Sequence, residues 1–166
     1  MPFYLKEIEN FSELNGCKSV LIVPCRFCPA ASLAVNRNKP YIEFFSRFLT
    51  TASYEQFIKT MKSDLEKKGV KADIFKSHLP HQFVLCGWTS KRRQRLLKYA
   101  KKYEVLLVLG CEAAVQTIRD SVKSSSCQVL QGMETVGVMS IKPSFKLPCN
   151  ISLELGSLTP MVHLEN

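Results

Sequence analysis

The stretch that decides the fold is SVLIVPCRFCP, residues 19–29, where a short apolar run leads directly into two cysteines. Residues 19–23 have the continuous apolar pattern of a strand that is covered on both faces. Two thiols follow three positions apart, at Cys25 and Cys28, and Pro29 suits the first turn of a helix. This order predicts a buried parallel strand with chemistry at its carboxyl end.

The chain has 166 residues, enough for one domain with its own core over residues 1–166. Its hydrophobic content of 46% and charged content of 22% are ordinary for a globular protein. The opening residues, MPFYLKEIENFSEL, carry several charges and do not have the apolar run of a signal peptide. No apolar run approaches the roughly 20 residues that cross a bilayer. We therefore expect a cytoplasmic protein with no membrane contact, in a compartment that keeps thiols reduced.

The formal net charge of +9 is compatible with a nucleic acid or with an acidic protein partner. Lysine supplies most of this charge and is scattered along the chain, so we expect no nucleic-acid partner. The most basic segment is KRRQRLLKYAKKY, residues 91–103. It is expected to be a solvated helix face, with docking on an acidic redox partner or methyltransferase as the alternative.

Strands and helices alternate along the chain. Further strands are predicted at VKADIF, QFVLCG, EVLLVLG, CQVLQG, VGVMSIK and residues 151–155. The spacing of apolar residues predicts helices over 41–49, 53–68, 91–103 and 111–122. Ser53 and Gln56 form a capping-box pattern at the start of the second of these, and Gly69 is expected to end it. The alternation predicts a single-domain α/β open sandwich, with a mostly parallel sheet and helices on both faces.

The seven cysteines divide by their position relative to the predicted strands. Four come at or just after a carboxyl end: Cys25, Cys28, Cys86 and Cys111. The other three lie elsewhere: Cys17 and Cys127 before strands, at the opposite edge, and Cys149 in the C-terminal segment. Because the carboxyl ends of parallel strands meet at one edge of a sheet, the first four are expected to converge.

Four convergent thiolates form a ligand set that suits either a [4Fe–4S] cluster or Zn²⁺. Cys111 has additional support, because a thiolate at a helix N-terminus is stabilised by free backbone N–H groups. Gly110 lets the backbone approach closely whatever lies there. Two alternatives remain: the cysteines are small core residues, or Cys25 and Cys28 are the nucleophile and resolving thiol of an oxidoreductase. His78 and His81 are expected to be solvated loop residues.

Residues 20–140 resemble the cysteine-rich C-terminal domain of methylenetetrahydrofolate reductase, which also occurs as the enzyme's small accessory subunit. The matching segments are VPCRFC, SYEQFIKTMKSDLEKKG, CGWTSKRRQRLLKYAKKY, VLLVLGCEAAVQTI and CQVLQGMETVGVM. Residues 143–166 are then a C-terminal extension. Thr135 stands where the family has a threonine. Where the family pattern has a third cysteine, this sequence has Ala31, Ser32 and Leu33. An aromatic segment, NKPYIEFFSRFLTTAS, is inserted after this point.

The resemblance implies an iron–sulfur or zinc site that relays electrons or organises a partner in one-carbon or methyl-transfer metabolism. It assigns Cys25, Cys28, Cys86 and Cys111 as metal ligands. Gly110, Glu112 and Thr135 are the expected cofactor-binding residues, although Glu112 replaces a family glycine. The flavin-binding barrel that reduces folate is not part of this sequence, so no catalytic residue is expected. The partner would be a reductase or a corrinoid or methyltransferase component.

Overall fold

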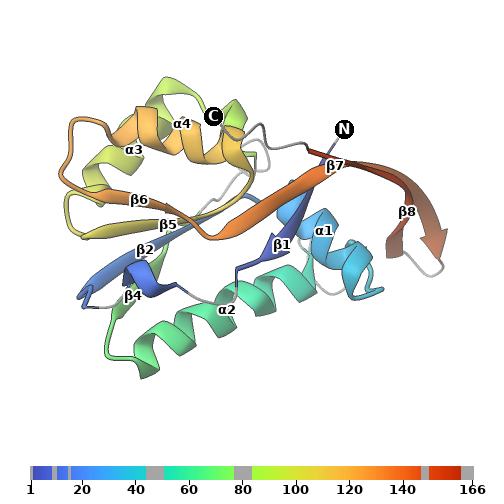
Figure 1. Ribbon diagram of the computed structural model, residues 1–166, viewed down its shortest axis with the longest axis horizontal. Helices are drawn as coiled ribbons and strands as arrows, with labels where there is room; N and C mark the ends of the chain where they lie inside the picture. The colour runs from blue at the N-terminus through green and yellow to red at the C-terminus, as the bar shows by residue number, and fades with distance from the viewer. Residues whose placement is uncertain are drawn as a thin grey trace.

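The computed structural model describes residues 2–8, 11–14, 16–43, 51–76, 84–146 and 150–161. These residues form a mixed α/β structure with two four-stranded sheets and four α-helices (Figure 1). One sheet is parallel, in the order β4-β2-β5-β6, and the other is antiparallel, in the order β1-β7-β8-β3. The α/β class is therefore correct, and the antiparallel sheet is an addition to the mostly parallel sheet that the sequence predicts.

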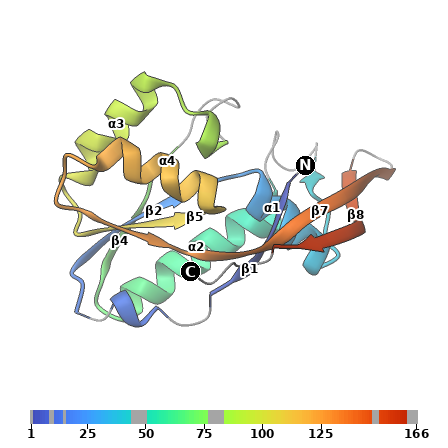
Figure 2. The ribbon, with the colours of Figure 1, turned by 45° about the horizontal axis from the view of Figure 1, so that its top comes forward.

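The parallel sheet contains β2 (Ser19–Pro24), β4 (Lys71–Ile74), β5 (Val105–Leu109) and β6 (Gln128–Gln131). Every residue of β5 is buried, which explains its continuous apolar run. In Figures 1 and 2, α3 (Ser90–Ala100) and α4 (Glu112–Val122) lie over one face of this sheet, and α2 (Ala52–Lys67) lies under the other. The expectation of parallel strands between helices is confirmed for this sheet.

The antiparallel sheet contains β1 (Phe3–Glu7), β3 (Ile42–Glu43), β7 (Met133–Lys146) and β8 (Asn150–Pro160). Only Gly132 separates β6 from β7, and only residues 147–149 separate β7 from β8. Connections this short have no room for the crossover that a parallel return requires, so β8 runs antiparallel to β7. The helix α1 (Cys28–Asn36) packs against β1 and β8 and so joins this sheet to the thiol segment.

The two strands of the β7–β8 hairpin alternate between an apolar and a polar face. Residues paired across the hairpin lie on the same face, and the apolar pairs are Met139 with Leu158, Ile141 with Leu155, Pro143 with Leu153, and Phe145 with Ile151. The polar face carries the pairs Ser140 with Ser157, Lys142 with Glu154, and Ser144 with Ser152. On the apolar face, Met139 and Leu153 are buried with Ala31 of α1 and Ile141 and Ile151 pack beside them, whereas Phe145, Leu155 and Leu158 are exposed.

The strand predicted at residues 82–87 is wrong for the part that the structure describes. Leu85–Gly87 form a short 3-10 helix, η3, which leads through Trp88 and Thr89 into α3. On each side of β2 the sheet position is already filled, by β4 and by β5. Leu85 is instead buried against the core as a single anchor while Cys86 is exposed. The next buried residue is Trp88, three positions further on, which is the spacing of a 3-10 turn rather than of a strand.

Two other local expectations need correction. The helix expected over residues 41–49 begins as the strand β3, which pairs with β8, and residues 44–50 lie outside the described residues. The capping box at Ser53 is wrong, because Thr51 is the N-cap of α2 and its hydroxyl donates to the carbonyl of Tyr41 instead. Gly69 does end that helix, with a positive φ of 79°.

Another short 3-10 helix, η1 (Ser12–Leu14), follows β1. None of the helices in the described part of the chain is long and apolar enough to cross a membrane.

Candidate thiol site

Three cysteines meet where the parallel strands β2 and β5 end. Cys25 follows β2, Cys28 begins α1, and Cys111 is the N-cap of α4, one residue beyond Gly110 at the end of β5. The backbone N–H of Cys25 donates to the carbonyl of Leu109 at 2.9 Å, which extends the pairing of β2 and β5 into the site. The convergence expected for these three residues follows from the direct parallel pairing of their strands.

Cys28 and Cys111 interact directly in the site. The Cys28 thiol hydrogen-bonds to Cys111, which lowers the pKa of Cys111 to about 6 and raises the pKa of Cys28. Burial opposes the shift of Cys111, while the backbone N–H groups of Ala113 and Ala114 at the start of α4 support it. Near neutral pH the pair therefore consists of a Cys111 thiolate and a Cys28 thiol that donates to it.

Cys25 is the more deeply buried partner of the C-x₂-C motif, with 2% of its surface exposed. Its burial raises its pKa, and the backbone near Leu85 and Phe27 partly offsets this effect. Charges on Cys111 and Cys86 raise the pKa further, so both thiols lie within electrostatic range of Cys25. Both thiols of the motif therefore ionise with difficulty, including Cys25, which the sequence favours as a nucleophile.

Cys86 reaches this region by a different route from the other three. It lies on η3 rather than at the end of a strand, and it is exposed, whereas Cys25, Cys28 and Cys111 are buried. The four thiols therefore come from three separate segments, with Cys86 on the solvent side of the group.

Two tyrosines border the site, and neither was selected as a functional residue from the sequence. Burial raises the pKa of Tyr41 to about 12, and charges on Cys28 and Cys25 contribute to the shift. Tyr54, on α2, is fully buried, and its hydroxyl donates to the carbonyl of Leu109 at 3.5 Å. The sequence signal for Tyr54 was its position three residues before Phe57, which places a polar aromatic side chain on the buried stripe of the helix.

An ion pair links the C-x₂-C segment to helix α2. Arg26 Nε donates to Glu55 Oε1 at 2.6 Å, and the two side chains are only 14% and 20% exposed. Burial and the charge of Cys25 raise the pKa of Tyr54, and the charge of Arg26 partly offsets this rise. This pair fixes the middle of the C-x₂-C segment against the sheet's lower helix layer.

The three expected cofactor-binding residues lie in different surroundings. A Cβ at Gly110 would lie 2.7 Å from Cβ of Ala114 and 3.4 Å from Cβ of Cys25, so the chain itself fills the space that glycine leaves. Glu112 is exposed in the first turn of α4. Thr135 is buried on β7, and its hydroxyl has no hydrogen-bond partner among the described residues.

Ser32 is one of the three residues that stand where the resembled family has a third cysteine, and it lies on α1. Its buried hydroxyl accepts from the backbone N–H of Leu5 and donates to the carbonyl of Cys28, both at 2.9 Å. This side chain therefore fastens β1 to the first turn of α1.

Cys17 and Cys127 lie at the opposite edge, as expected. Burial raises the pKa of Cys127 to about 11, with a smaller contribution from Cys17. Cys149, His78 and His81 lie outside the described residues.

The donors fit a metal centre by their chemistry, because thiolates are the ligands that Zn²⁺ and iron–sulfur clusters prefer. Their arrangement is that of a hydrogen-bonded pair, Cys28 with Cys111, beside Cys25 and Cys86. Within the described ranges, no group of three or more His, Cys, Asp or Glu side chains is arranged to hold a metal ion. Metal binding would require these thiols to reorient.

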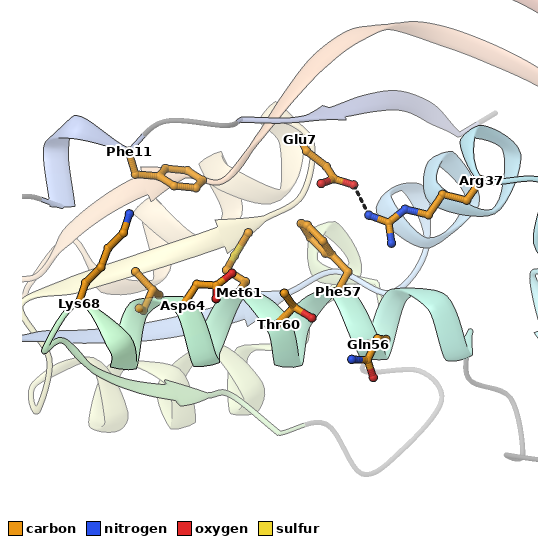
Figure 3. Close-up of a pocket in the computed structure, with 10 residues that line it drawn as sticks. Glu7, Phe11, Arg37, Gln56, Phe57, Thr60, Met61, Asp64 and Lys68 are labelled. Atoms are coloured by element: carbon orange, nitrogen blue, oxygen red, sulfur yellow. Dashed lines mark hydrogen bonds and ion pairs between the residues drawn. The ribbon is translucent and has the colours of Figure 1, made fainter.

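A second concave feature lies away from the thiols, between α2 and the segment β1–η1 (Figure 3). This cavity has a volume of about 320 Å³. Phe57, Met61 and Phe11 point into it, and the ion pair of Arg37 with Glu7, at 2.7 Å, closes one end. No cysteine lines it.

Comparison with protein-family models, with curated proteins and with solved structures finds no match to this chain.

Proposed function

We propose that the chain is an accessory protein that holds a metal centre, a [4Fe–4S] cluster or Zn²⁺, on Cys25, Cys28, Cys86 and Cys111. The observation that carries this proposal is the gathering of four thiols from three segments beside the carboxyl edge of the parallel sheet. Open α/β sheets bind ligands at this edge. The chemistry of an all-thiol donor set selects soft metals over Mg²⁺ or Ca²⁺.

The protonation states of the thiols bear on metal binding. Cys111 is already a thiolate near neutral pH, which is the ligating form. Cys25 and Cys28 have raised pKa values, so binding must release their protons to solvent. A bound cluster would supply one-electron transfer, and a bound zinc ion would supply structural cross-linking of the three segments. The half-buried Tyr41 and the fully buried Tyr54 cover the inner side of the thiols.

The metabolic role follows from the family resemblance. We propose that the chain works in the cytoplasm, in one-carbon or methyl-transfer metabolism, as a single α/β domain of the open-sandwich type. Its partner would be a reductase or a corrinoid or methyltransferase component, with neither nucleic acid nor a membrane involved. The chain would serve as an accessory subunit, and the partner would carry the catalytic residues.

A second candidate function is thiol–disulfide exchange, favoured by the Cys28–Cys111 pair. The Cys111 thiolate would attack a substrate disulfide, form a mixed disulfide and release one substrate thiolate. Cys28, after losing its proton, would then attack the Cys111 sulfur and release the second substrate thiolate. The protein dithiol is oxidised to a Cys28–Cys111 disulfide and the substrate disulfide is reduced to two thiols. In this mechanism the nucleophile is Cys111, outside the C-x₂-C motif.

Anaerobic purification followed by iron, sulfide and zinc analysis and a visible spectrum tests these functions. Bound iron and sulfide with thiolate-to-iron absorption at roughly 400 nm supports the cluster, and a colourless protein with one zinc supports the zinc form. Cys111→Ser should remove the metal, and Cys127→Ser, at the opposite edge, should retain it. A protein that remains metal-free after anaerobic reconstitution, and whose Cys28–Cys111 disulfide forms and is reduced reversibly, contradicts the metal site and supports thiol exchange.

A further inference from the structure

A cavity of about 310 Å³ lies between the edge strand β4 and helix α3, and none of its lining residues belongs to the thiol site. Its volume is at the lower end of the range of about 300–1,000 Å³ that small-molecule sites occupy. The lining residues that define its chemistry are Asp73, Phe75, Lys76, Arg95, Tyr99 and Tyr103.

An aromatic wall forms one side of this β4–α3 cavity. The rings of Phe75 and Tyr99 meet edge to face, with centroids 5.6 Å apart. Phe75 is buried, with the Trp88 ring 5.5 Å away and the Arg92 guanidinium 4.4 Å from its centroid, so the wall is held in place from behind. Tyr99 remains 40% exposed and offers its ring to a planar ligand.

Two cations line the same cavity. Lys76 follows β4, and Arg95 projects from α3 with its guanidinium 6.0 Å from the Tyr99 ring centroid. Lys102 lies 5.8 Å from the same ring, and α3 itself contains no acidic residue. An anionic group that enters the cavity therefore meets positive charge from both sides, and an arginine fork matches the oxygens of a phosphate.

A hydrogen-bond acceptor lies inside the cavity beside the aromatic wall. Tyr103 donates its hydroxyl proton to Oδ2 of Asp73 at 2.8 Å. Burial and this hydrogen bond raise the pKa of Tyr103 to about 12, so the phenol stays a donor and keeps the carboxylate in position. Because a carboxylate has about four lone-pair sites, Asp73 can also accept from an amino or hydroxyl group of a ligand.

From these contacts we propose that the β4–α3 cavity binds a nucleoside monophosphate. The base packs on Tyr99 and Phe75, a polar edge of the base or the ribose hydroxyls donate to Asp73, and the phosphate pairs with Arg95 and Lys76. A neutral aromatic compound would form no ion pair with either cation. A free phosphate would leave the aromatic wall without a partner. The combination selects a ligand that is planar at one end and anionic at the other, and it is independent of the metal site.

The only tryptophan of the chain, Trp88, packs on Phe75 and so reports on the cavity wall. Titration with AMP, followed by Trp88 fluorescence and by equilibrium dialysis, should give saturable binding with a dissociation constant below about 1 mM. Adenosine and inorganic phosphate should each bind at least about tenfold more weakly. No saturable binding of AMP in either measurement overturns the proposal, as does phosphate binding that equals AMP binding.

Matched variants separate the two halves of the ligand. Arg95→Gln should weaken AMP about tenfold and leave adenosine unchanged, because it removes a phosphate contact. Tyr99→Ala should weaken both AMP and adenosine. Lys101→Gln removes the same charge from the exposed C-cap of α3 and should change AMP affinity by less than about twofold. An equal effect of Arg95→Gln and Lys101→Gln would show only diffuse attraction to a basic helix and would overturn the site. Far-UV circular dichroism checks that each variant is folded.

Discussion

In β5 of the parallel sheet all five residues are buried, whereas in the β7–β8 hairpin one face is polar and only part of the other is covered. The two central strands of the parallel sheet, β2 and β5, lie between two helix layers and are buried on both faces apart from Ser19, whereas the edge strands β4 and β6 keep exposed residues. The hairpin packs on a single helix, α1, that is shorter than its strands. The thiols lie at the edge of the parallel sheet, whose backbone is packed against helices on both faces. Rigid placement of reactive groups therefore coincides with two-sided burial.

The largest expected effect compares one leucine from each region. Leu107→Ala in β5 should lower the free energy of unfolding by about 3 kcal/mol, because Leu107 is fully buried and its truncation leaves a cavity. Leu155→Ala in β8 should cost less than about 1 kcal/mol, because Leu155 is 43% exposed. Urea denaturation measures both. Equal losses of unfolding free energy in the two variants would show that the apolar face of the hairpin is covered in solution. The two regions would then not differ in burial.

A smaller effect is expected at the edge where the thiols lie. Gly110→Ala places a methyl group against Ala114 and Cys25 and should cost about 1–3 kcal/mol through overpacking. Gly87→Ala is the matched control, since a Cβ there meets nothing within 4 Å. Denaturation and the alkylation rate of Cys111 should both change in the first variant and remain near the wild type in the second. A neutral Gly110→Ala would mean that the site tolerates movement of α4.

The titration of Cys111 gives the next test. Its alkylation by iodoacetamide should rise with pH around a midpoint near 6, and Cys28→Ala should move this midpoint upward because the thiol donor is lost. Cys127→Ala is the control and should leave the midpoint unchanged. A midpoint near the ordinary thiol value of 9.0 in the unmodified protein would rule out the thiolate pair.

The same titration has a consequence for stability. Between pH 6 and 9 the folded chain holds fewer protons on Cys111 than the unfolded chain, so this residue's contribution to the unfolding free energy rises with pH. The contribution is lost as the pH falls through about 6. Cys28 acts in the opposite direction above pH 9, because its pKa is raised. Denaturation at pH 5 and pH 8 of the parent and of Cys111→Ala shows whether the difference between the two proteins grows with pH.

The smallest expected effect is on the outer end of the hairpin. Phe145 is 81% exposed, so Phe145→Ser should change the free energy of unfolding by less than about 0.5 kcal/mol. The same change should reduce concentration-dependent self-association in light scattering, because it removes an exposed aromatic ring. A loss of more than about 1 kcal/mol would place Phe145 inside a packed contact.

The local sequence was sufficient to predict the elements whose residues are buried in the parallel-sheet layer. The apolar runs at residues 19–23 and 104–110 predict β2 and β5, and the register of these strands then brings Cys25, Cys28 and Cys111 together. The apolar stripe of α4 is also correct, since Val115, Ile118 and Val122 are buried. Such patterns are readable because each residue reports the same environment as its neighbours.

Sequence reasoning failed where a long-range partner decides the structure. Leu85 and Cys86 resemble the end of a strand locally, but both neighbouring positions of β2 are occupied by other strands. The pairing of β1 with β7 joins residues more than 120 positions apart, and no local pattern encodes it. The roles of Tyr41 and Tyr54 depend on the fold in the same way, because only the tertiary structure brings them to the thiols.

The placement of β1 affects how the chain assembles during synthesis. Residues 3–7 are synthesised long before their strand partner in β7, which is made only after residue 132. The loop that must close is long, and the entropy of closing it delays this contact relative to local ones. The parallel sheet can form around β2, β4 and β5 before β1 has paired with β7. We therefore expect β1 to join last, and a nascent chain halted before residue 133 should leave residues 3–7 open to proteolysis.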